Sequence, residues 1–214
     1  MYGRLRGSPG SGRPIAWWGV GAVAVVLGGL GLAALPTAAY AIPGGVCNGT
    51  ISNQTFQYGV VVNPGATCTL DNDSVRGFVN VYGVLNITNN FSITGSLIDR
   101  PGGQLFIQAS VISVGGNLRI DNAAAFSFSA SPGSTVNGDF NIVGLSSPDS
   151  SLTVDGTTID GSLNLIYDNV GSIQLGGNTV DGNINCHADL VNPTNGGIPN
   201  TVKGREEGQC ANLG

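Results

Sequence analysis

The stretch Ile-Asp-Gly-Ser-Leu-Asn-Leu at residues 159–165 returns, one repeat later, as Val-Asp-Gly-Asn-Ile-Asn-Cys at residues 180–186. In both copies a β-branched residue stands two positions before a glycine, and an apolar residue stands two positions after it. The pattern also occurs at residues 93–97, 114–118 and 136–140, and in degenerate form at residues 75–79 and 202–206. The repeated glycines are Gly95, Gly116, Gly138, Gly161 and Gly182, so the steps between them are 21, 22, 23 and 21. Such a regular period indicates a repeat architecture.

Each repeat contains three short segments of alternating polarity. Apolar and polar residues alternate after the glycine, which is typical of a strand with one buried face. A second alternating pair recurs at Leu105 and Ile107, Phe126 and Phe128, Leu152 and Val154, and Ile173 and Leu175. Turn-forming residues separate the segments. Three strands in about 21 residues predict one rung of an all-β, right-handed parallel β-helix (solenoid), with coils stacked about 4.8 Å apart.

The repeated glycine has a physical cause, because a sharp corner between two strands requires positive φ or a close backbone approach. The residues that follow the glycine should form a polar column on the outside of the solenoid, namely Ser96, Asn117, Asp139, Ser162 and Asn183. An antiparallel sandwich or barrel is the alternative, since short strands at regular spacing also occur there. That fold seldom repeats one motif in register five times, so we expect the solenoid.

The first 41 residues have the order of a secretory signal peptide. Three arginines (Arg4, Arg6 and Arg13) precede an uncharged apolar run at residues 15–35, and Ala-Tyr-Ala at residues 39–41 supplies the small residues that a signal peptidase accepts. We therefore expect a signal peptide helix within residues 1–41 and cleavage after Ala41. The alternative is a retained membrane anchor, because an apolar run of this length can span the hydrocarbon core of a bilayer.

The part of the chain after the expected cut is acidic. It holds five basic residues against thirteen Asp and Glu, so its net charge is 5 minus 13, or −8. Such a charge repels phosphate backbones, and nucleic acid is excluded as a partner. We expect one domain with N-terminal capping coils at residues 42–76, a β-helix core at 77–185 and a C-terminal capping coil at 186–214.

Four cysteines remain in this exported part, and sequence alone allows three pairings. The spacing from Cys47 to Cys68 is 21 and that from Cys186 to Cys210 is 24, so each pair is separated by about one coil. The distance between adjacent coils suits a disulfide, whereas a bond between the two groups would have to cross about five coils. We expect Cys47–Cys68 and Cys186–Cys210, one disulfide at each end of the solenoid. A zinc site is the alternative, but no Cys-x-x-Cys pair exists.

The closing stretch has a recognisable form: Gly-Asn-Ile-Asn-Cys at residues 182–186, Asn-Thr-Val-Lys-Gly at 200–204 and Gly-Gln-Cys at 208–210. From about residue 95 to its end, the chain resembles uncharacterised secreted right-handed parallel β-helix proteins of high-GC Gram-positive bacteria. The resemblance implies the architecture and the export of the chain, and it implies no activity.

Acidic residues are the best candidates for a ligand site, namely Asp139, Asp155, Asp160, Asp168 and Asp181. Asp160 and Asp181 both precede a repeat glycine, so stacked coils should place them near one another. Paired carboxylates perform glycoside hydrolysis, and the same geometry binds calcium. The spacing from Arg100 to Arg119 is close to one repeat, which predicts neighbouring coils and a basic group for a lyase. The structural alternative is that Asp-Gly simply forms a tight turn.

The sequence contains no catalytic motif, and we predict no catalytic residue, metal site or cofactor. His187 is the single histidine, and no Gly-x-Ser-x-Gly elbow accompanies it. The leading hypothesis is an exported, non-catalytic structural or surface-binding protein of the cell envelope or extracellular space. The alternative hypothesis is a carbohydrate-binding or polysaccharide-cleaving protein. Polysaccharide or cell-envelope components are the expected partners, and a membrane is a partner only if the N-terminal segment is retained.

Overall fold

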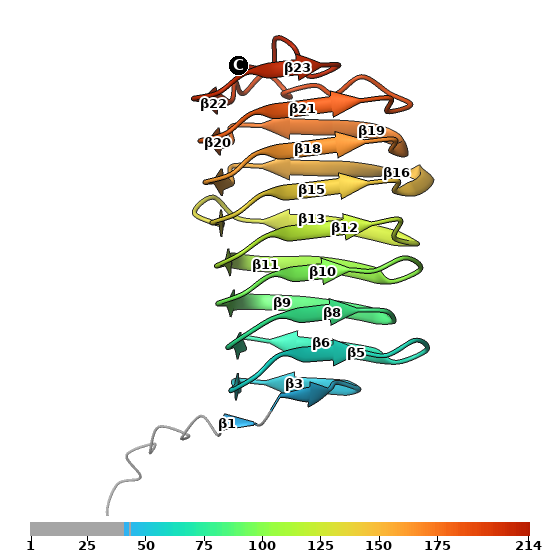
Figure 1. Ribbon diagram of the computed structural model, residues 1–214, viewed down its shortest axis with the longest axis vertical. Coiled ribbons are helices and arrows are strands. Elements are labelled where there is room, and N and C mark those ends of the chain that lie inside the picture. Colours follow the sequence, from blue (N-terminus) through green and yellow to red (C-terminus); the bar gives the residue numbers. More distant parts are fainter. Residues whose placement is uncertain (1–40, 43) are drawn as a thin grey trace, which may run out of the picture. The chain divides into compact units, whose positions relative to one another are not determined.

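The computed structural model describes residues 41–42 and 44–214. These residues form a parallel β-solenoid whose strands stack coil upon coil (Figure 1). The front strands run from left to right and the rear strands return while the chain rises, so the coil is right-handed, as parallel crossovers nearly always are. The expected signal peptide lies outside the described residues apart from Ala41. In the described part, no helix is long and apolar enough to cross a membrane.

Three sheets contain the strands of the described residues. The largest sheet has twelve strands: β1 (Ala41–Ile42), β3 (Gly49–Ser52), β4 (Thr55–Phe56), β6 (Thr67–Asp71), β7 (Ser74–Val75), β9 (Val84–Ile93), β11 (Gln104–Val114), β13 (Ala125–Ala130), β14 (Thr135–Val136), β17 (Thr158–Ile159), β20 (Thr179–Val180) and β22 (Thr201–Val202). The second sheet has nine: β2 (Gly45–Val46), β5 (Val60–Val62), β8 (Val79–Val81), β10 (Leu97–Asp99), β12 (Leu118–Asp121), β15 (Phe140–Val143), β18 (Leu163–Ile166), β21 (Ile184–His187) and β23 (Glu206–Gly208). The third pairs β16 (Ser146–Asp155) with β19 (Asn169–Gly176).

The register confirms the predicted repeat. Leu97, Leu118, Phe140, Leu163 and Ile184 are the first apolar residues after the repeat glycines, and each pairs in parallel with the next. The coil steps are therefore those that the sequence predicts. The chain turns about eight times, from β2 to β23. The boundaries predicted at residues 76 and 185 stay predictions, because the described residues form one continuous stack.

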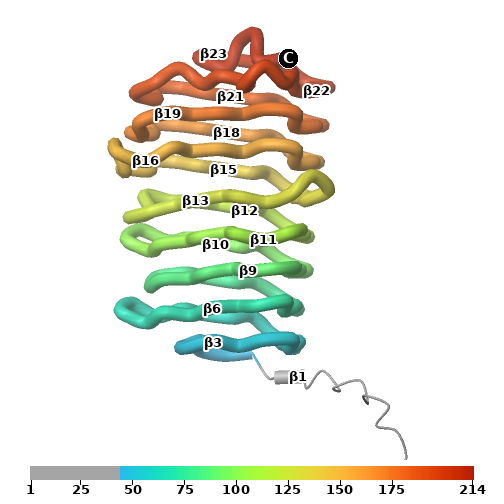
Figure 2. The backbone as a smooth tube through the Cα atoms, turned by 180° about the vertical axis from the view of Figure 1, so that it is seen from behind, coloured from blue at the N-terminus to red at the C-terminus, as the bar shows by residue number. Residues whose placement is uncertain are grey.

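The inward positions of every coil form a single apolar core. The predicted alternating pairs, from Leu105 and Ile107 to Ile173 and Leu175, are all buried. Three phenylalanines of one coil meet in this core, with ring centroids 5.4 Å apart for Phe128 and Phe140. Beside them the long sheet is interrupted, since β13 pairs only with β11 and β16 pairs only with β19. Figure 2 shows these long strands from behind.

The repeat glycines stack at one corner, and close packing explains them. The backbone N–H of Gly161 donates to the carbonyl of Gly138, and that of Gly182 donates to Gly161, at 3.1 and 2.9 Å. A Cβ atom on Gly161 would lie only 2.7 Å from the carbonyl oxygen of Gly138. Among the repeat glycines in the described part, Gly77 has positive φ. At the other copies, glycine is therefore required by the close approach of the neighbouring backbone and not by positive φ.

Both ends of the described solenoid carry the predicted disulfides, with Cα–Cα distances of 5.6 Å for Cys47–Cys68 and 5.2 Å for Cys186–Cys210. The partners lie on adjacent coils at offset positions. Cys68 pairs in register with Gly49, and Cys186 pairs with Gly208, each two positions from the bonded cysteine. The offset arises because each of these two coils is shorter than the spacing between its bonded cysteines.

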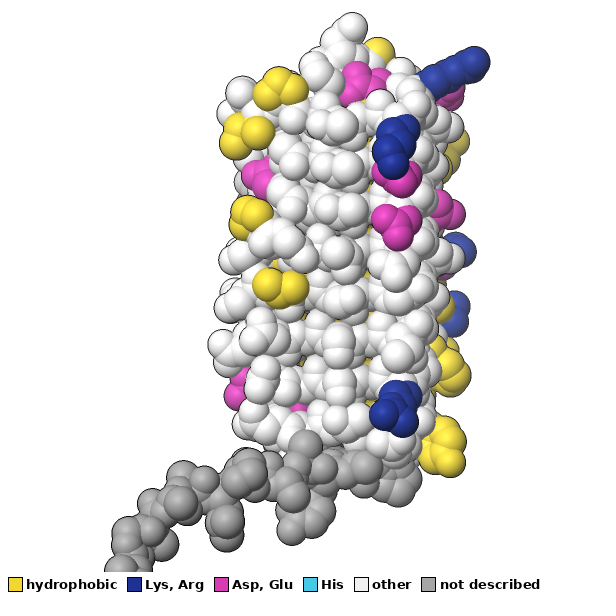
Figure 3. All heavy atoms as spheres, turned by 90° about the vertical axis from the view of Figure 1, so that its left-hand side faces the viewer, with side chains coloured by type: hydrophobic (Ala, Val, Ile, Leu, Met, Phe, Trp, Pro, Cys, Tyr) yellow, Lys and Arg dark blue, Asp and Glu magenta, His cyan; other side chains and the backbone are white. Residues whose placement is uncertain are grey.

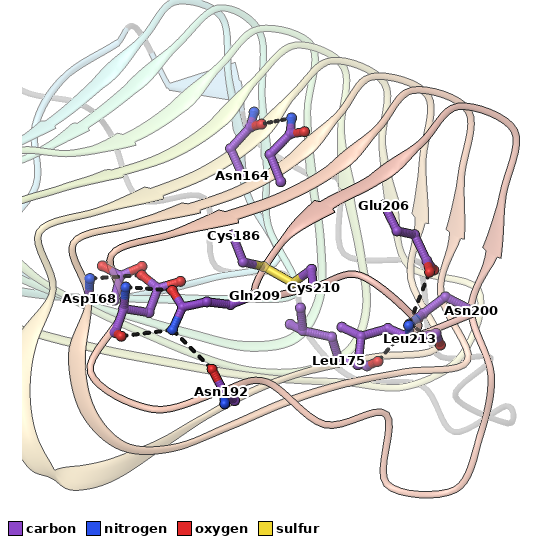
Figure 4. Close-up of a disulfide and its surroundings, with 12 residues drawn as sticks. Asn164, Asp168, Leu175, Cys186, Asn192, Asn200, Glu206, Gln209, Cys210 and Leu213 are labelled. Carbon is purple, nitrogen blue, oxygen red and sulfur yellow. Dashed lines mark hydrogen bonds between the residues drawn. A yellow bond between two sulfur atoms is a disulfide. The ribbon is translucent and has the colours of Figure 1, made fainter.

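The C-terminal tail closes the last coil (Figure 4). Glu206 occupies the slot that holds Ile184 one coil below, and its carboxylate accepts hydrogen bonds from the backbone N–H groups of Asn212 and Leu213, at 3.1 and 3.0 Å. The Leu213 side chain is buried on the core. The Glu206 charge in this otherwise apolar slot therefore holds the tail that covers the core.

Candidate functional site

The strand segments just before the glycine corner carry one column of hydroxyl side chains. In six coils this segment is a short separate strand, and in two it is the end of β9 or β11. Each strand places a β-branched or aromatic residue inward and the preceding residue outward. In every one of eight successive coils the outward residue is Ser or Thr, and the register pairs each with the next. We call these residues the hydroxyl column: Thr55, Ser74, Ser92, Ser113, Thr135, Thr158, Thr179 and Thr201.

The hydroxyl column lies on an accessible surface. Its members are half-buried or exposed, and Figure 3 faces this side of the molecule, where most of the surface is uncharged and polar. Hydroxyls of adjacent coils bond to each other at two places, with 2.9 Å between Thr55 Oγ1 and Ser74 Oγ and 3.2 Å between Thr135 Oγ1 and Ser113 Oγ. A hydroxyl both donates and accepts, so the column offers a hydrogen-bonding lattice at the spacing of the coils.

Asp160 and Asp181 lie in a second outward column, two positions beyond the hydroxyl column. Their neighbours Ile159 and Val180 pair in register, so the structure brings the two aspartates together as predicted. Both side chains are exposed. Asp181 also forms an ion pair with Lys203 of the next coil at 2.7 Å, a partner that the sequence analysis did not consider.

Asp139 belongs to the third outward column, directly after the glycine. Its Oδ1 accepts the backbone N–H of Ser162 in the next coil at 2.8 Å. Asn117 accepts from Asp139 N–H, Ser162 accepts from Asn183 N–H, and Asn183 accepts from Arg205 N–H in the same way. The predicted polar column therefore exists, and its bonds satisfy backbone donors at the corner. Asp139 is held by this structural ladder.

The two arginines lie on neighbouring coils, as their spacing predicted: Arg100 directly follows β10, and Arg119 lies in β12. Arg119 pairs in register with Ile98 of β10, close to Arg100 in the chain. Arg100 donates two hydrogen bonds to Asn80 Oδ1, at 3.1 and 2.9 Å, and Arg119 pairs with Asp121 at 3.1 Å. Within the described residues neither arginine forms a hydrogen bond or ion pair with Asp139, Asp160 or Asp181. The two arginines, the pair Asp160 and Asp181, and Asp139 thus form separate groups.

His187 is exposed at the end of β21. Burial has the largest effect on the pKa of nearby Asp189 and raises it, whereas the backbone N–H of Asp168 and the charge of His187 lower it. Across residues 41–42 and 44–214, no group of three or more His, Cys, Asp or Glu residues could hold a metal ion.

Four aspartates are buried in the described part, namely Asp73, Asp99, Asp168 and Asp189, and the sequence analysis did not predict their burial. Asp99 is fully buried in an inward slot of β10 between Val81 and Ile120, and in the described part neither carboxyl oxygen has a hydrogen-bond partner. Burial raises the pKa of Asp99 to about 8, and the nearby backbone N–H of Arg100 offsets only part of this effect. The sequence Leu-Ile-Asp-Arg-Pro-Gly-Gly carried a signal, because a polar residue stands where the other central copies have an aliphatic residue or Cys.

Asp168 is also buried, and it belongs to a series of hydrogen bonds between successive coils at the C-terminal end (Figure 4). It accepts the backbone N–H of Leu145 at 2.8 Å, Asp189 accepts that of Asp168 at 2.9 Å, and Gln209 accepts that of Asp189 at 2.8 Å. Burial raises the pKa of Asp168 to about 7; the Leu145 bond lowers it, and the charge of Asp189 raises it. Asp168 therefore satisfies a backbone donor where the chain turns, which is a structural role.

Two shallow grooves lie in the described part. One of about 360 Å³ lies beside β13 and β16, lined mainly by Ser127, Ser129, Ser151, Thr153 and Asp155. Asp155 is engaged there by the backbone N–H of Gly176 at 2.7 Å and by the Gln174 amide. The other, of about 570 Å³, lies on the C-terminal cap and includes Arg205, Glu206 and Glu207. Neither groove contains the candidate pair Asp160 and Asp181.

Exposed aromatic side chains mark the N-terminal coils. Tyr58 is 70% exposed and Phe78 is 52% exposed. Arg76 of the same corner donates to Gln57 Oε1 at 3.3 Å. We call these four residues the aromatic corner.

No protein-family model, curated protein or solved structure matches this chain. The structure shows a β-solenoid of about eight turns with a disulfide at each described end. Disulfides of this kind are typical of proteins that fold in an oxidising environment. The kinship with secreted β-helix proteins of high-GC Gram-positive bacteria stays a prediction.

Proposed function

We propose that this protein is an exported, non-catalytic rod that binds an extended polymer along its hydroxyl column, at the cell envelope or outside the cell. One observation carries the proposal: eight successive coils present Ser or Thr at the same outward position. The fold does not require this uniformity. The neighbouring outward column holds Gln57, Arg76, Thr94, Gly115, Asn137, Asp160, Asp181 and Lys203 in the same eight coils.

A polymer is the ligand class that suits a repeating surface. Single hydrogen bonds to exposed hydroxyls contribute little, because water competes for both partners. Many such bonds made by one rigid lattice to one chain add up, since each contact after the first is intramolecular. Polysaccharides carry hydroxyl groups on every unit and match a surface of alternating donors and acceptors.

Two features support export. The first 41 residues have the composition and order of a signal peptide, and the disulfides suit an oxidising compartment. The expected cut after Ala41 falls within β1, so cleavage would leave Ile42 as the first residue of the rod. N-terminal sequencing of the exported protein tests this point, and a start well before residue 42 would indicate a retained anchor.

The binding proposal is tested with insoluble polysaccharides. The exported protein is mixed with a panel of them, and the bound fraction and any released sugar are measured. Thr135→Val, Thr158→Val and Thr179→Val together should weaken binding strongly, because valine keeps the shape and removes the hydroxyl. Thr69→Val, on the outward face of β6, is the control and should bind normally. Release of sugar, or equal binding by the triple variant, would overturn the proposal.

A second candidate function is polysaccharide cleavage, favoured by the stacking of Asp160 on Asp181. Retaining glycosidases use two carboxyl groups about 5 Å apart, which is near the spacing of adjacent coils. Asp181 is engaged by Lys203, however, and both aspartates are exposed at a corner. Under this alternative, Asp160→Asn with Asp181→Asn abolishes sugar release by the exported protein and leaves binding intact; the binding proposal expects no sugar release from either form.

A further inference from the structure

We propose that the aromatic corner, formed by Gln57, Tyr58, Arg76 and Phe78, is a subsite for one sugar ring of an acidic polysaccharide. The inference rests on the proposed function and deepens it, because it names the ligand class and the place where the polymer is fixed along the rod. Tyr58 and Phe78 would supply ring faces, and Arg76 would pair with a uronate carboxylate.

The two aromatic rings lie on consecutive coils at the glycine corner. Val60 pairs in register with Val79, so Phe78 lies beside Gly59 and Tyr58 lies beside Gly77. A Cβ atom on Gly59 would lie 3.0 Å from the Phe78 ring, which means that this ring packs on a backbone without a side chain. The five central copies have Ser, Asn or Asp after the glycine, and the last copy has Arg205. The aromatic corner is therefore a local departure from the repeat.

Planar polar groups stand next to the rings. The Arg76 guanidinium donates to the Gln57 amide oxygen at 3.3 Å across the same two coils. Both groups can make paired hydrogen bonds to neighbouring oxygen atoms of a ligand. Two positions before them lie Thr55 and Ser74, the first two members of the hydroxyl column. A polymer lying along that column would reach the aromatic corner at its N-terminal end.

The charge around Arg76 favours an anionic ring. Between residues 44 and 98 the acidic residues are Asp71 and Asp73, and both are engaged elsewhere. Asp71 accepts hydrogen bonds from Ser52, Thr88 and Asn89, and Asp73 is buried. In the described part Arg76 forms no ion pair, so a ligand carboxylate would meet an unneutralised cation. The C-terminal half carries most of the negative charge, so the acidic ring would bind at the N-terminal end, and uncharged units of the polymer would lie along the rest of the hydroxyl column.

The size of the aromatic corner favours a sugar ring over a protein partner. A stable protein interface needs about 800 Å² from each partner with an apolar centre. Among the other exposed large apolar residues of the described part, Val46 and Tyr82 also lie on the N-terminal coils, whereas Val111, Tyr167, Leu190 and Ile198 belong to later coils and do not extend this corner. Two rings with adjoining planar polar groups match the apolar face and the hydroxyl edge of a single pyranose.

The test uses the exported protein and oligogalacturonates, with the uncharged methyl esters of the same oligosaccharides as a second ligand. Calorimetry gives the affinity, and saturation-transfer NMR identifies sugar protons that contact aromatic rings. Tyr58→Ala and Phe78→Ala should each weaken binding roughly tenfold, the scale of losing one stacked ring. Arg76→Gln should abolish the preference for the acid over the ester. Tyr167→Ala removes an equally exposed ring at 69% and should change nothing.

Circular dichroism and the thermal midpoint show whether each variant is folded, and Phe78→Leu keeps the corner filled if Phe78→Ala destabilises it. Unchanged affinity of a folded Tyr58→Ala or Phe78→Leu variant would overturn the inference, as would equal affinity for acid and ester in the unsubstituted protein. If polymers bind through the hydroxyl column while the aromatic variants behave normally, the inference fails and the proposed function stands. If no polysaccharide binds at all, both fail.

Discussion

Replacing Asp99 by Val should stabilise the folded protein by several kcal/mol at neutral pH. Asp99 is fully buried among apolar side chains, and its carboxyl oxygens have no partner in the described part. Burial raises its pKa from 3.8 to about 8. In the unfolded chain this group is ionised at pH 7, whereas in the folded protein it stays protonated. About three pH units separate 3.8 from 7, and at about 1.4 kcal/mol per unit this difference costs about 4 kcal/mol.

The pH dependence follows from the number of protons bound. The folded protein holds a proton on Asp99 that the unfolded chain has lost, so the free energy of unfolding falls as pH rises from about 4 to about 8. Above about 8 both states are ionised and the loss is complete. Below about 4 both states are protonated and the ionisation cost disappears. The advantage of Asp99→Val should therefore be small at pH 4, grow through neutrality and level off above pH 8.

The assay is urea unfolding of the exported protein, with its disulfides intact, at pH 4, 7 and 9. Val matches Val81 in the coil below, so the substitution fills the slot without a new cavity or polar group. Asp160→Asn removes an exposed carboxylate and serves as the control, with an expected change within about 0.5 kcal/mol at each pH. A variant less stable than the unsubstituted protein at pH 7, or an advantage that does not change with pH, would refute the reasoning.

Three further predictions follow from the packing, each measured by the same unfolding assay. Gly161→Ala should destabilise the fold by about 3 kcal/mol or more, because its Cβ would lie 2.7 Å from the Gly138 carbonyl oxygen. Gly45→Ala is the control and should be nearly neutral, because its Cβ would meet nothing within 4 Å. Equal effects of the two substitutions would contradict the close-packing argument. Asn178→Ala should lower the free energy of unfolding by about 2 kcal/mol or more. The buried Asn178 side chain donates to the Val154 carbonyl and accepts from the Thr157 N–H. An unchanged unfolding midpoint would show that water replaces these bonds. Removing Cys186–Cys210 by paired Ala substitution should cost about 3 kcal/mol for a loop of this length, and a loss near zero would show that the terminal coil is held by its other contacts.

The architecture could be predicted because its causes repeat. Each coil must place an apolar residue on either side of the corner, and each corner must admit the backbone of the coil below. These demands fall on the same slots in every coil, so the sequence shows them as a period. The disulfide pairing was predictable for the same reason. The offset between partners was not, since it depends on the lengths of the first and last coils, each of which is shorter than the spacing between its bonded cysteines.

A second corner of the coil lies just before the hydroxyl column, for example between β6 and β7 or between β19 and β20. This corner escaped prediction because its causes are local. There the chain turns through positive φ, at Asn53 and Asn72 in early coils and at Gly156 and Gly177 in later ones, and the next residues bond to the backbone of adjacent coils. Asp73, Asn178 and Asn200 perform this task with different side chains. Residue type therefore varies while the geometry stays constant, and a search for identical letters misses it.

Asp139, Asp160 and Asp181 show how one residue type takes different roles on a solenoid. Asp139 follows its glycine and accepts a backbone N–H, whereas Asp160 and Asp181 precede theirs and face solvent. A shift of two positions thus moves a carboxylate from the structural ladder to the free surface.

The hydroxyl column was readable in the sequence one position before the inward β-branched or aromatic residue of each coil. It passed unnoticed because Ser and Thr are ordinary strand residues, and only the register shows that eight of them form one line. A function spread over such a line should respond to substitution gradually. Each hydroxyl contributes a small share, so loss of one coil weakens binding slightly and loss of several weakens it steeply. The aromatic corner should behave in the opposite way, because two rings and one cation concentrate the contacts on two coils, and a single substitution there removes a large part of the binding.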